Sequence, residues 1–196
     1  MIRSALVAVL LALLSPAAAP AAETLPQHQP GPRERLAAQT LDQLFEGLRL
    51  TKGPNAAKIY AQEIQNRFEQ SGSDTADLLL TWASEAMSSN DNALALDVLD
   101  QLVQIKPDFA EAWNKRATVE FLMKDFGASL SDIRRTLQLQ PRHFGALAGL
   151  GIILEDIGKD DEAILAYRRA LEINPRLDAA RTSLERLEKE VAARAT

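Results

Sequence analysis

Apolar side chains recur every three or four residues through most of the chain after residue 32, which is the spacing of one buried face of an α-helix. Residues 33–50 show this pattern first, and a Gly-Pro-Asn break at 53–55 separates them from a second helix predicted over residues 56 to about 70. Near the other end, an apolar stripe runs from Leu177 to Val191 with charged residues on the opposite face. The pattern predicts an all-α protein.

The first residues are predicted to be a signal peptide and not part of the fold. Arg3 is the only charge before the apolar stretch 5–14, and small residues follow it up to Ala22. An uncleaved membrane anchor is the weaker alternative, because about 20 apolar residues are needed to span hydrocarbon. We expect cleavage after Ala21, with a nearby alanine as the second choice. The mature protein would then be periplasmic and without a membrane span.

The segment that follows is predicted to be a tether. Residues 22–32 contain Pro26, Pro30 and Pro32 and almost no apolar side chains. Such a composition is typical of a flexible, polyproline-like linker. His28 lies in this segment without a metal-binding partner at suitable spacing, so we interpret it as a solvated side chain.

Three prolines reveal an internal repeat in the rest of the chain. Pro107, Pro141 and Pro175 are each separated by 34 residues, and similar leucine-containing segments precede them. If each proline is the thirty-second residue of a unit, the units span 76–109, 110–143 and 144–177. Every unit then has a small residue at its eighth and twentieth positions, where two helices could cross closely. These residues are Ala83, Ala117, Gly151, Ala95, Ser129 and Ala163.

This repeat resembles the tetratricopeptide repeat, a 34-residue unit of two antiparallel helices. The resemblance implies a right-handed superhelical solenoid, in which residues 33–75 form a divergent N-terminal helical hairpin similar to a first repeat. Residues 178–196 would form the C-terminal capping helix. The phase of Trp82, Trp113 and Tyr167 in the repeat favours packing between helices over an aromatic ligand cage.

One charged residue departs from the repeat pattern. Arg116 stands at the seventh position of its unit, where an apolar residue is usual. We expect its stem to cover apolar surface while its charge reaches water.

Composition and charge argue against catalysis and against nucleic acid as a partner. The chain has 22 Lys and Arg against 27 Asp and Glu, no Cys and two His. A net charge of −5 gives no reason to bind a polyanion, and the absence of Cys removes thiolate chemistry. His143 has no nucleophile or second structured His beside it, and the acids at 155–156 and 160–162 fall at a turn and a helix start. We therefore predict a protein that is not an enzyme and that binds no metal or cofactor.

The resemblance also implies a partner-binding groove on the concave face, lined by the first helix of each unit. Lys115 would be its only basic side chain, with Asn114 beside it, which is too little for the clusters of Lys, Arg and Asn with which some relatives clamp a peptide's terminal carboxylate. We still expect Lys115 to face solvent and to attract an acidic anchor. Gly145 and Gly149 fall at groove positions of the third unit, whose lining is small and apolar and suits a partner's side chains or helix. The other groove positions are Asp77, Leu80, Thr81, Ser84, Met87, Glu111, Asn114, Lys115, Thr118, Phe121, Ala148, Ile152 and Glu155.

The resemblance extends to two shorter segments, 112–118 and 141–147, which are similar to exported periplasmic repeat proteins of alphaproteobacteria that have been connected with cell-envelope integrity. They imply a non-enzymatic scaffold or adaptor that binds a protein or peptide in its groove. Three alternatives stay open: an adaptor for an envelope protease, an assembly factor for a secreted complex such as a cytochrome, and an enzyme subunit with unrecognised chemistry.

Overall fold

The computed structural model describes residues 31–194, and within them the chain forms ten α-helices and no strand. The signal peptide and most of the linker predicted above lie outside the described residues. No helix among residues 31–194 combines the length and the apolar character needed to cross a membrane. The helices are α1 (Pro32–Ala37), α2 (Leu41–Leu50), α3 (Pro54–Phe68), α4 (Asp74–Ser88), α5 (Asn92–Ile105), α6 (Ala110–Leu122), α7 (Phe126–Leu139), α8 (Phe144–Asp156), α9 (Asp160–Ile173) and α10 (Asp178–Arg194).

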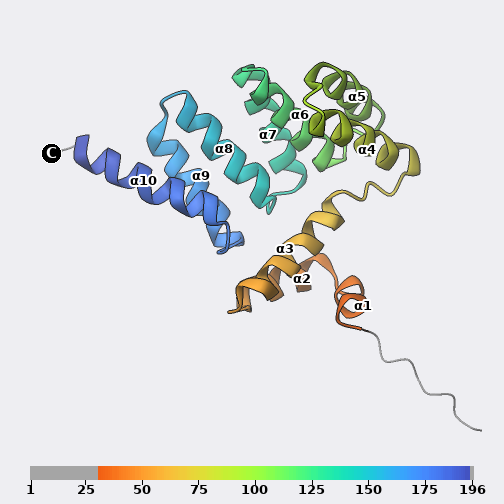
Figure 1. The fold of residues 1–196 in the computed structure, drawn as a ribbon, viewed down its shortest axis with the longest axis horizontal. Coiled ribbons are helices and arrows are strands. Elements are labelled where there is room, and N and C mark those ends of the chain that lie inside the picture. Colours follow the sequence, from red (N-terminus) through yellow and green to blue (C-terminus); the bar gives the residue numbers. More distant parts are fainter. Residues whose placement is uncertain (1–30, 195–196) are drawn as a thin grey trace, which may run out of the picture.

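Helices α4 to α9 stack as three antiparallel pairs in an elongated array, α4–α5, α6–α7 and α8–α9 (Figure 1). Pro107, Pro141 and Pro175 each lie just after the second helix of a pair, where the missing N–H and the ring prevent the helix from continuing. This arrangement confirms the predicted fold class, an all-α solenoid.

The small residues of the repeat are buried where the two helices of each pair cross. Ala83, Ala117 and Gly151 on the first helices and Ala95, Ser129 and Ala163 on the second helices are all inaccessible to solvent or nearly so. The Ser129 hydroxyl donates a hydrogen bond of 2.7 Å to the carbonyl oxygen of Ala117, so even the polar member of the set is satisfied.

The turn inside each pair also repeats. Asn90, Lys124 and Gly158 occupy the same place in the three units, and all have a positive φ, of 59°, 68° and 75°. Two of the three are not glycine, so the surrounding contacts hold a left-handed conformation that L-residues seldom adopt.

The C-terminal end of the array is closed by α10. Its apolar stripe packs on α9, where Leu187 and Ala180 join the buried cluster of Ala163 and Tyr167. The opposite face is charged, and the Arg168 guanidinium of α9 pairs with a carboxylate of α10 at 2.6 Å. Helix α10 therefore has the polar outer surface that the end of a solenoid requires.

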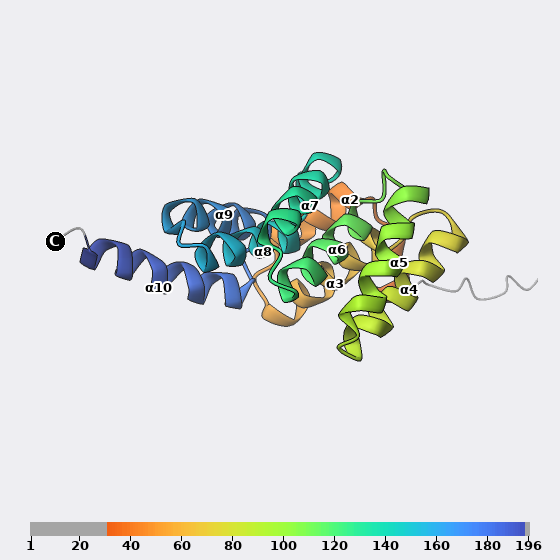
Figure 2. The ribbon, with the colours of Figure 1, turned by 90° about the horizontal axis from the view of Figure 1, so that it is seen from above.

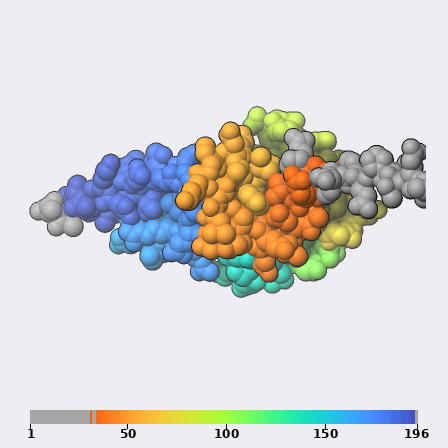
Figure 3. All heavy atoms as spheres, turned by 90° about the horizontal axis from the view of Figure 1, so that it is seen from below, coloured from red at the N-terminus to blue at the C-terminus, as the bar shows by residue number. Residues whose placement is uncertain are grey.

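The N-terminal hairpin does not stack ahead of the first unit, which corrects the interpretation of it as a first repeat. Helices α2 and α3 instead pack beneath the middle of the array and cover part of its underside (Figure 3). Phe45 and Phe68 bury against Phe144 at the start of α8. Ile173 at the end of α9 and Leu177 in the turn after it contact the same cluster. These contacts lie in the third unit, and the stacking of Phe68 on His143 extends the docking to the second unit.

Polar contacts fix this docking at two turns of the array. Arg142 forms an ion pair with Asp42, and its guanidinium lies 4.2 Å from the centre of the Phe45 ring. Arg176 donates a hydrogen bond of 3.0 Å to the carbonyl oxygen of Lys52. Arg142 and Arg176 lie in the turns after α7 and α9. The hairpin therefore docks on the same structural position of two successive repeats.

Candidate interaction groove

The first helices of the second and third units, α6 and α8, lie on either side of a cavity of about 320 Å³. Ile133 of α7 belongs to its lining, and the helices contribute side chains from successive turns. The lining is formed by Asn114, Ala117, Thr118, Phe121, Leu122, Ile133, Gly145, Ala148, Gly149, Ile152 and Ile153.

The groove is apolar and carries no charged side chain in its lining. At one end, the Phe121 and Phe126 rings pack at a centroid distance of 5.8 Å, and the Lys124 ammonium lies 5.3 Å from the Phe121 ring centre. Ile152 is substantially exposed on the opposite wall. Exposed apolar side chains around a concave site favour the burial of a partner's apolar side chain.

Two glycines of α8 serve different purposes. A Cβ at Gly151 would lie 2.5 Å from the Tyr167 ring, so the helix crossing requires glycine there. A Cβ at Gly149 would meet only the Ile133 side chain, at an ordinary 3.7 Å. Glycine inside a helix costs roughly 1 kcal/mol relative to alanine. Packing does not require glycine at position 149, and the absence of a side chain there leaves the groove floor open.

Five of the thirteen residues predicted to line a groove come together here. They are Asn114, Thr118, Phe121, Ala148 and Ile152, and Gly145 and Gly149 from the same prediction join them. The remaining eight lie elsewhere.

The residues predicted from the first unit contribute to α4 itself. Leu80 is buried in the core shared by α4, α5 and α6, and Met87 packs against that core. Asp77 accepts a hydrogen bond of 2.8 Å from the backbone N–H of Ser71 and so fixes the turn before α4. Thr81 and Ser84 donate to backbone carbonyls one turn earlier in the helix. None of the five lines the groove between α6 and α8.

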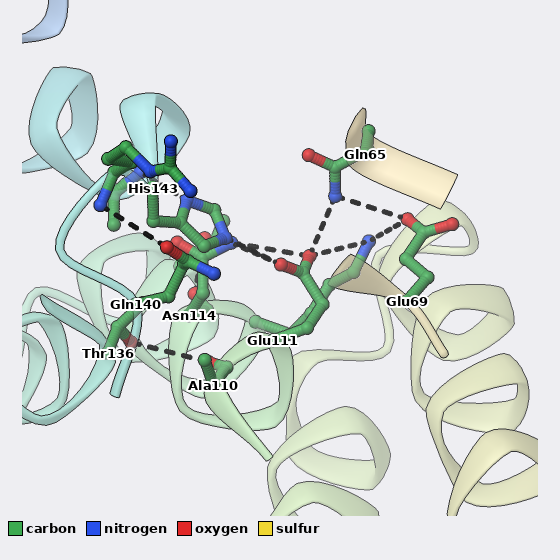
Figure 4. A network of polar contacts seen from close by, with 12 residues as sticks. Gln65, Glu69, Ala110, Glu111, Asn114, Thr136, Gln140 and His143 are labelled. Atoms are coloured by element: carbon green, nitrogen blue, oxygen red, sulfur yellow. Dashed lines mark hydrogen bonds and ion pairs between the residues drawn. The ribbon is translucent and has the colours of Figure 1, made fainter. Parts of the chain in front are cut away.

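Glu111 was predicted to face the groove, and the structure buries it instead. Its carboxylate is 2.8 Å from Nε2 of His143 and 3.1 Å from the side-chain amide of Gln65 on α3 (Figure 4). His143 is equally buried, and its Nδ1 accepts a hydrogen bond of 3.0 Å from the backbone N–H of Ala146. This geometry assigns the proton to Nε2, which donates to Glu111. His143 is thus the N-cap of α8, and its role is structural.

Lys115 belongs to the same cluster, contrary to the expectation of a free groove cation. Its ammonium lies 3.5 Å from Glu69 on the N-terminal hairpin and 3.7 Å from Glu111. The Phe68 ring stacks on His143 with centroids 4.6 Å apart. Helix α3 therefore occupies the part of the concave face next to Glu111 and Lys115, and the positive charge that could attract an acidic anchor is already neutralised.

Glu155 is also structural. It accepts a hydrogen bond of 3.2 Å from the Tyr167 hydroxyl and pairs with Arg186 of α10. Burial, together with the nearby Glu155 charge, raises the pKa of Tyr167 to about 12. Glu155 thus joins α8 to α9 and to the terminal helix.

Sequence reasoning missed four lining residues, namely Ala117, Leu122, Ile133 and Ile153. Ala117 stands at the eighth position of its unit, which the sequence assigned to packing, and Ile133 lies on the second helix of the same unit. Both are buried, and both also reach the groove floor from below. A buried side chain can pack against a neighbouring helix on one side and line a cavity on the other. The repeat period alone does not separate such residues from those that only pack.

A second cluster of charges lies between α5, α6 and α7. The Arg116 guanidinium forms two hydrogen bonds with Asp132, of 2.6 and 2.9 Å, and a third of 2.9 Å with Asp100. The hydrogen bonds to Asp132 raise the pKa of Arg116. Arg116 therefore binds two carboxylates from neighbouring helices, and the expectation that its charge reaches water is wrong.

Glu120 belongs to the same cluster but is less well hydrogen-bonded than Asp100 and Asp132. It is buried 3.8 Å from Arg116, and its Oε2 has no hydrogen-bond partner among the described residues. Burial, reinforced by the negative charge of Asp132, raises the pKa of Glu120 to about 7. Within residues 31–194, no group of three or more His, Asp or Glu side chains is arranged to hold a metal ion.

Comparisons with known proteins agree with this architecture. A family model described as tetratricopeptide repeat matches residues 123–178. A TPR repeat-containing protein of Rhizobium etli is 41% identical over 158 residues, which cover 81% of this chain and 78% of that protein.

Solved structures show the same fold. The first TPR of Spaghetti (RPAP3), bound to the HSP90 peptide SRMEEVD, aligns with a TM-score of 0.58 at 22% identity, covering 60% of this chain and 93% of that chain. The MamA protein aligns with a TM-score of 0.57 at 18% identity, covering 79% of this chain and 82% of that one.

Proposed function

Since the chain belongs to the tetratricopeptide repeat family, whose members generally mediate contacts between proteins, we propose that it is a non-enzymatic scaffold that holds a partner in the groove between α6 and α8. The observation that carries the proposal is Gly149. It keeps a groove open in the middle of a helix, where packing would accept a larger and more helix-favouring residue.

The groove fits an uncharged, apolar segment of the partner. Its lining has no charge, and the nearest predicted anchor for a carboxylate, Lys115, is paired with Glu69 and Glu111. Spaghetti is a structural neighbour whose bound peptide, SRMEEVD, contains three acidic residues. We propose that this chain selects a different class of segment, with one or two apolar side chains that enter between Phe121 and Ile152.

We propose that the protein works in the periplasm and supports cell-envelope integrity. The support for export is the short charged start, the apolar stretch 5–14 and the small residues up to Ala22. The support for an envelope role is the resemblance of residues 112–118 and 141–147 to exported repeat proteins. N-terminal sequencing of the mature protein should begin near Ala22, and recovery of intact Met1 would contradict export.

The groove is tested with a substitution that fills it without disturbing the core. Gly149→Leu should leave the melting temperature equal or higher, because the Cβ has room and leucine favours the helix. A photo-crosslinking residue at Thr118 should trap a partner in cells that carry the otherwise wild-type protein, and it should trap none with Gly149→Leu. The matched control is Gly127→Leu on α7, an exposed helical glycine outside the groove.

The same variants test the physiological part of the proposal. Deletion of the gene should sensitise cells to detergent and to cell-wall antibiotics. Wild type and Gly127→Leu should restore tolerance, whereas Gly149→Leu should not. If deletion leaves tolerance unchanged, the partner trapped from Thr118 decides between a protease adaptor and an assembly factor.

A further inference from the structure

The outer face of α4 has the position of a helix interface, but no helix among residues 31–194 packs on it. In the second and third units, the third residue of the unit is Ala112 or Ala146, and each is buried. The seventh residue of the second unit, Arg116, reaches back to Asp100 on the preceding unit's second helix. The corresponding residues of the first unit are Leu78 and Trp82, which are 48% and 51% exposed.

Helices α2 and α3 do not cover this face, because they dock on the second and third units at the middle of the array (Figure 3). Figure 2 shows α4 and α5 at one end of the array and α10 at the other. The ends of a solenoid are normally polar, and α10 follows that rule. An end that exposes a tryptophan and a leucine one helical turn apart departs from it and marks an interaction surface.

Charge on the first unit points to the kind of partner. Residues 70–105, which include α4 and α5, contain six acidic residues and no Lys or Arg. On α4, Asp74, Leu78, Trp82 and Glu85 follow one another along a single face, with an acid at each end and the apolar pair between them. Neither Asp74 nor Glu85 forms an ion pair within the described residues.

We propose that the face of α4 formed by Asp74, Leu78, Trp82 and Glu85 docks a basic amphipathic helix of another protein. The partner's apolar stripe packs on Leu78 and Trp82, in the place that a preceding unit's second helix would take. Its Lys or Arg side chains face Asp74 and Glu85 and orient it.

Two other occupants match the surface less well. Residues 22–30 of this chain carry no Lys or Arg and few apolar side chains, so they lack the complementary charge. A second copy would have to offer a basic helix, but its terminal helix α10 alternates acids with bases on its outer face. The surface is separate from the groove between α6 and α8, so this inference stands or falls independently of the proposed function.

The test uses a pair of synthetic peptides with the same leucine stripe, one flanked by lysines and the other by glutamates. Fluorescence anisotropy should show the full chain binding the lysine peptide, at least tenfold more tightly than the glutamate peptide, with an affinity that falls as salt is added. The double variant Leu78→Ser, Trp82→Ser should weaken binding at least tenfold, and Glu85→Lys should weaken it severalfold.

Two variants control the measurement. Leu165→Ser removes an exposed leucine from α9 and should bind as wild type does. Gly149→Leu fills the groove and should also leave the affinity unchanged, which separates this surface from the groove. Melting curves of all variants show whether each is folded.

Several results would overturn the proposal. Equal binding of both peptides would show a nonspecific apolar patch, and equal binding by the double variant would place the peptide elsewhere. A concentration-dependent dimer that the double variant abolishes would identify a second copy as the occupant. Binding by a chain that starts at residue 31, but not by the full chain, would identify the chain's own residues before 31 as the occupant.

Discussion

Gly149 and Gly151 lie two residues apart in α8 and should respond in opposite ways to the same substitution. Gly149→Ala should raise the free energy of unfolding by roughly 0.5 to 1 kcal/mol, because the new methyl has room and the helix gains propensity. Gly151→Ala should lower it by about 1 to 3 kcal/mol, because the methyl collides with Tyr167. Denaturant titrations of both variants measure the difference, and changes of the same sign would contradict the assigned crossing.

Glu120 should make the stability of the protein depend on pH. Its pKa is about 7 in the folded protein, whereas an unfolded glutamate titrates near 4.5. Between these values the folded state holds a proton that the unfolded state has lost, so the free energy of unfolding falls as the pH rises from about 4.5 to 7. Arg116 lowers this pKa, whereas Asp100, Asp125 and Asp132 reinforce its increase.

The substitution Glu120→Gln removes this dependence. At pH 7.5 the variant should be more stable than the wild type by about 2 to 3 kcal/mol, and near pH 4.5 the two should converge. Thermal melts across this range give the comparison. Glu185→Gln, on the exposed side of α10, serves as the control and should follow the wild type at every pH. A constant offset between wild type and Glu120→Gln would disprove the titration.

Much of the repeat array was predictable because its contacts are local. The small residues at the helix crossings and the prolines at the helix ends act within one unit or between neighbours, so a 34-residue period locates them. The same period identified five groove residues on α6 and α8. It also assigned Trp82 to packing, which is wrong because no helix among residues 31–194 packs on that side of the first unit.

The N-terminal hairpin was not predictable in this way. Its place depends on Phe68 meeting His143 and Phe144, and on Glu69 meeting Lys115. These pairs have no fixed spacing in the sequence, so a repeat pattern carries no information about them. By contrast, Asp100, Arg116 and Asp132 are spaced by 16 residues. That regular spacing could have been used to predict from the sequence that these charges form a cluster.

Lys115 tests how the hairpin α2–α3 is attached. Lys115→Glu places a third carboxylate beside Glu69 and Glu111, and it should lower the free energy of unfolding by about 2 kcal/mol. Lys115→Met keeps the apolar stem and should cost about 1 kcal/mol or less, because Gln65, Asn114 and His143 still bond to Glu111.

Hydrogen exchange provides the local readout for these variants. Lys115→Glu should speed exchange in α3 far more than in α9. If the glutamate variant is as stable as wild type, the ion pairs do not hold the hairpin, and the apolar cluster around Phe45 and Phe68 does so alone.

The docked hairpin should also change how the array unfolds. Units of a linear solenoid contact only their neighbours, whereas α2 and α3 connect the turns after α7 and α9. Phe68→Ala should therefore accelerate hydrogen exchange both in α3 and at the start of α8, while α5 keeps its protection. The substitution should cost about 3 to 5 kcal/mol if the cluster cannot collapse around the lost ring. Acceleration confined to α3 would show that the hairpin does not couple the units.

The docking of the hairpin also sets an order of events in time. Asp42 and Lys52 meet partners 100 and 124 residues further along the chain. A ribosome adds about 5 to 20 residues each second, so α2 and α3 exist for roughly ten seconds before the turns that receive them are made. During that interval the faces of Phe45 and Phe68 that will pack on Phe144 have no surface of their own chain to cover them. The hairpin is thus made before the repeat units but docks only after the last of them is complete. The nascent protein is most open to wrong associations during that interval.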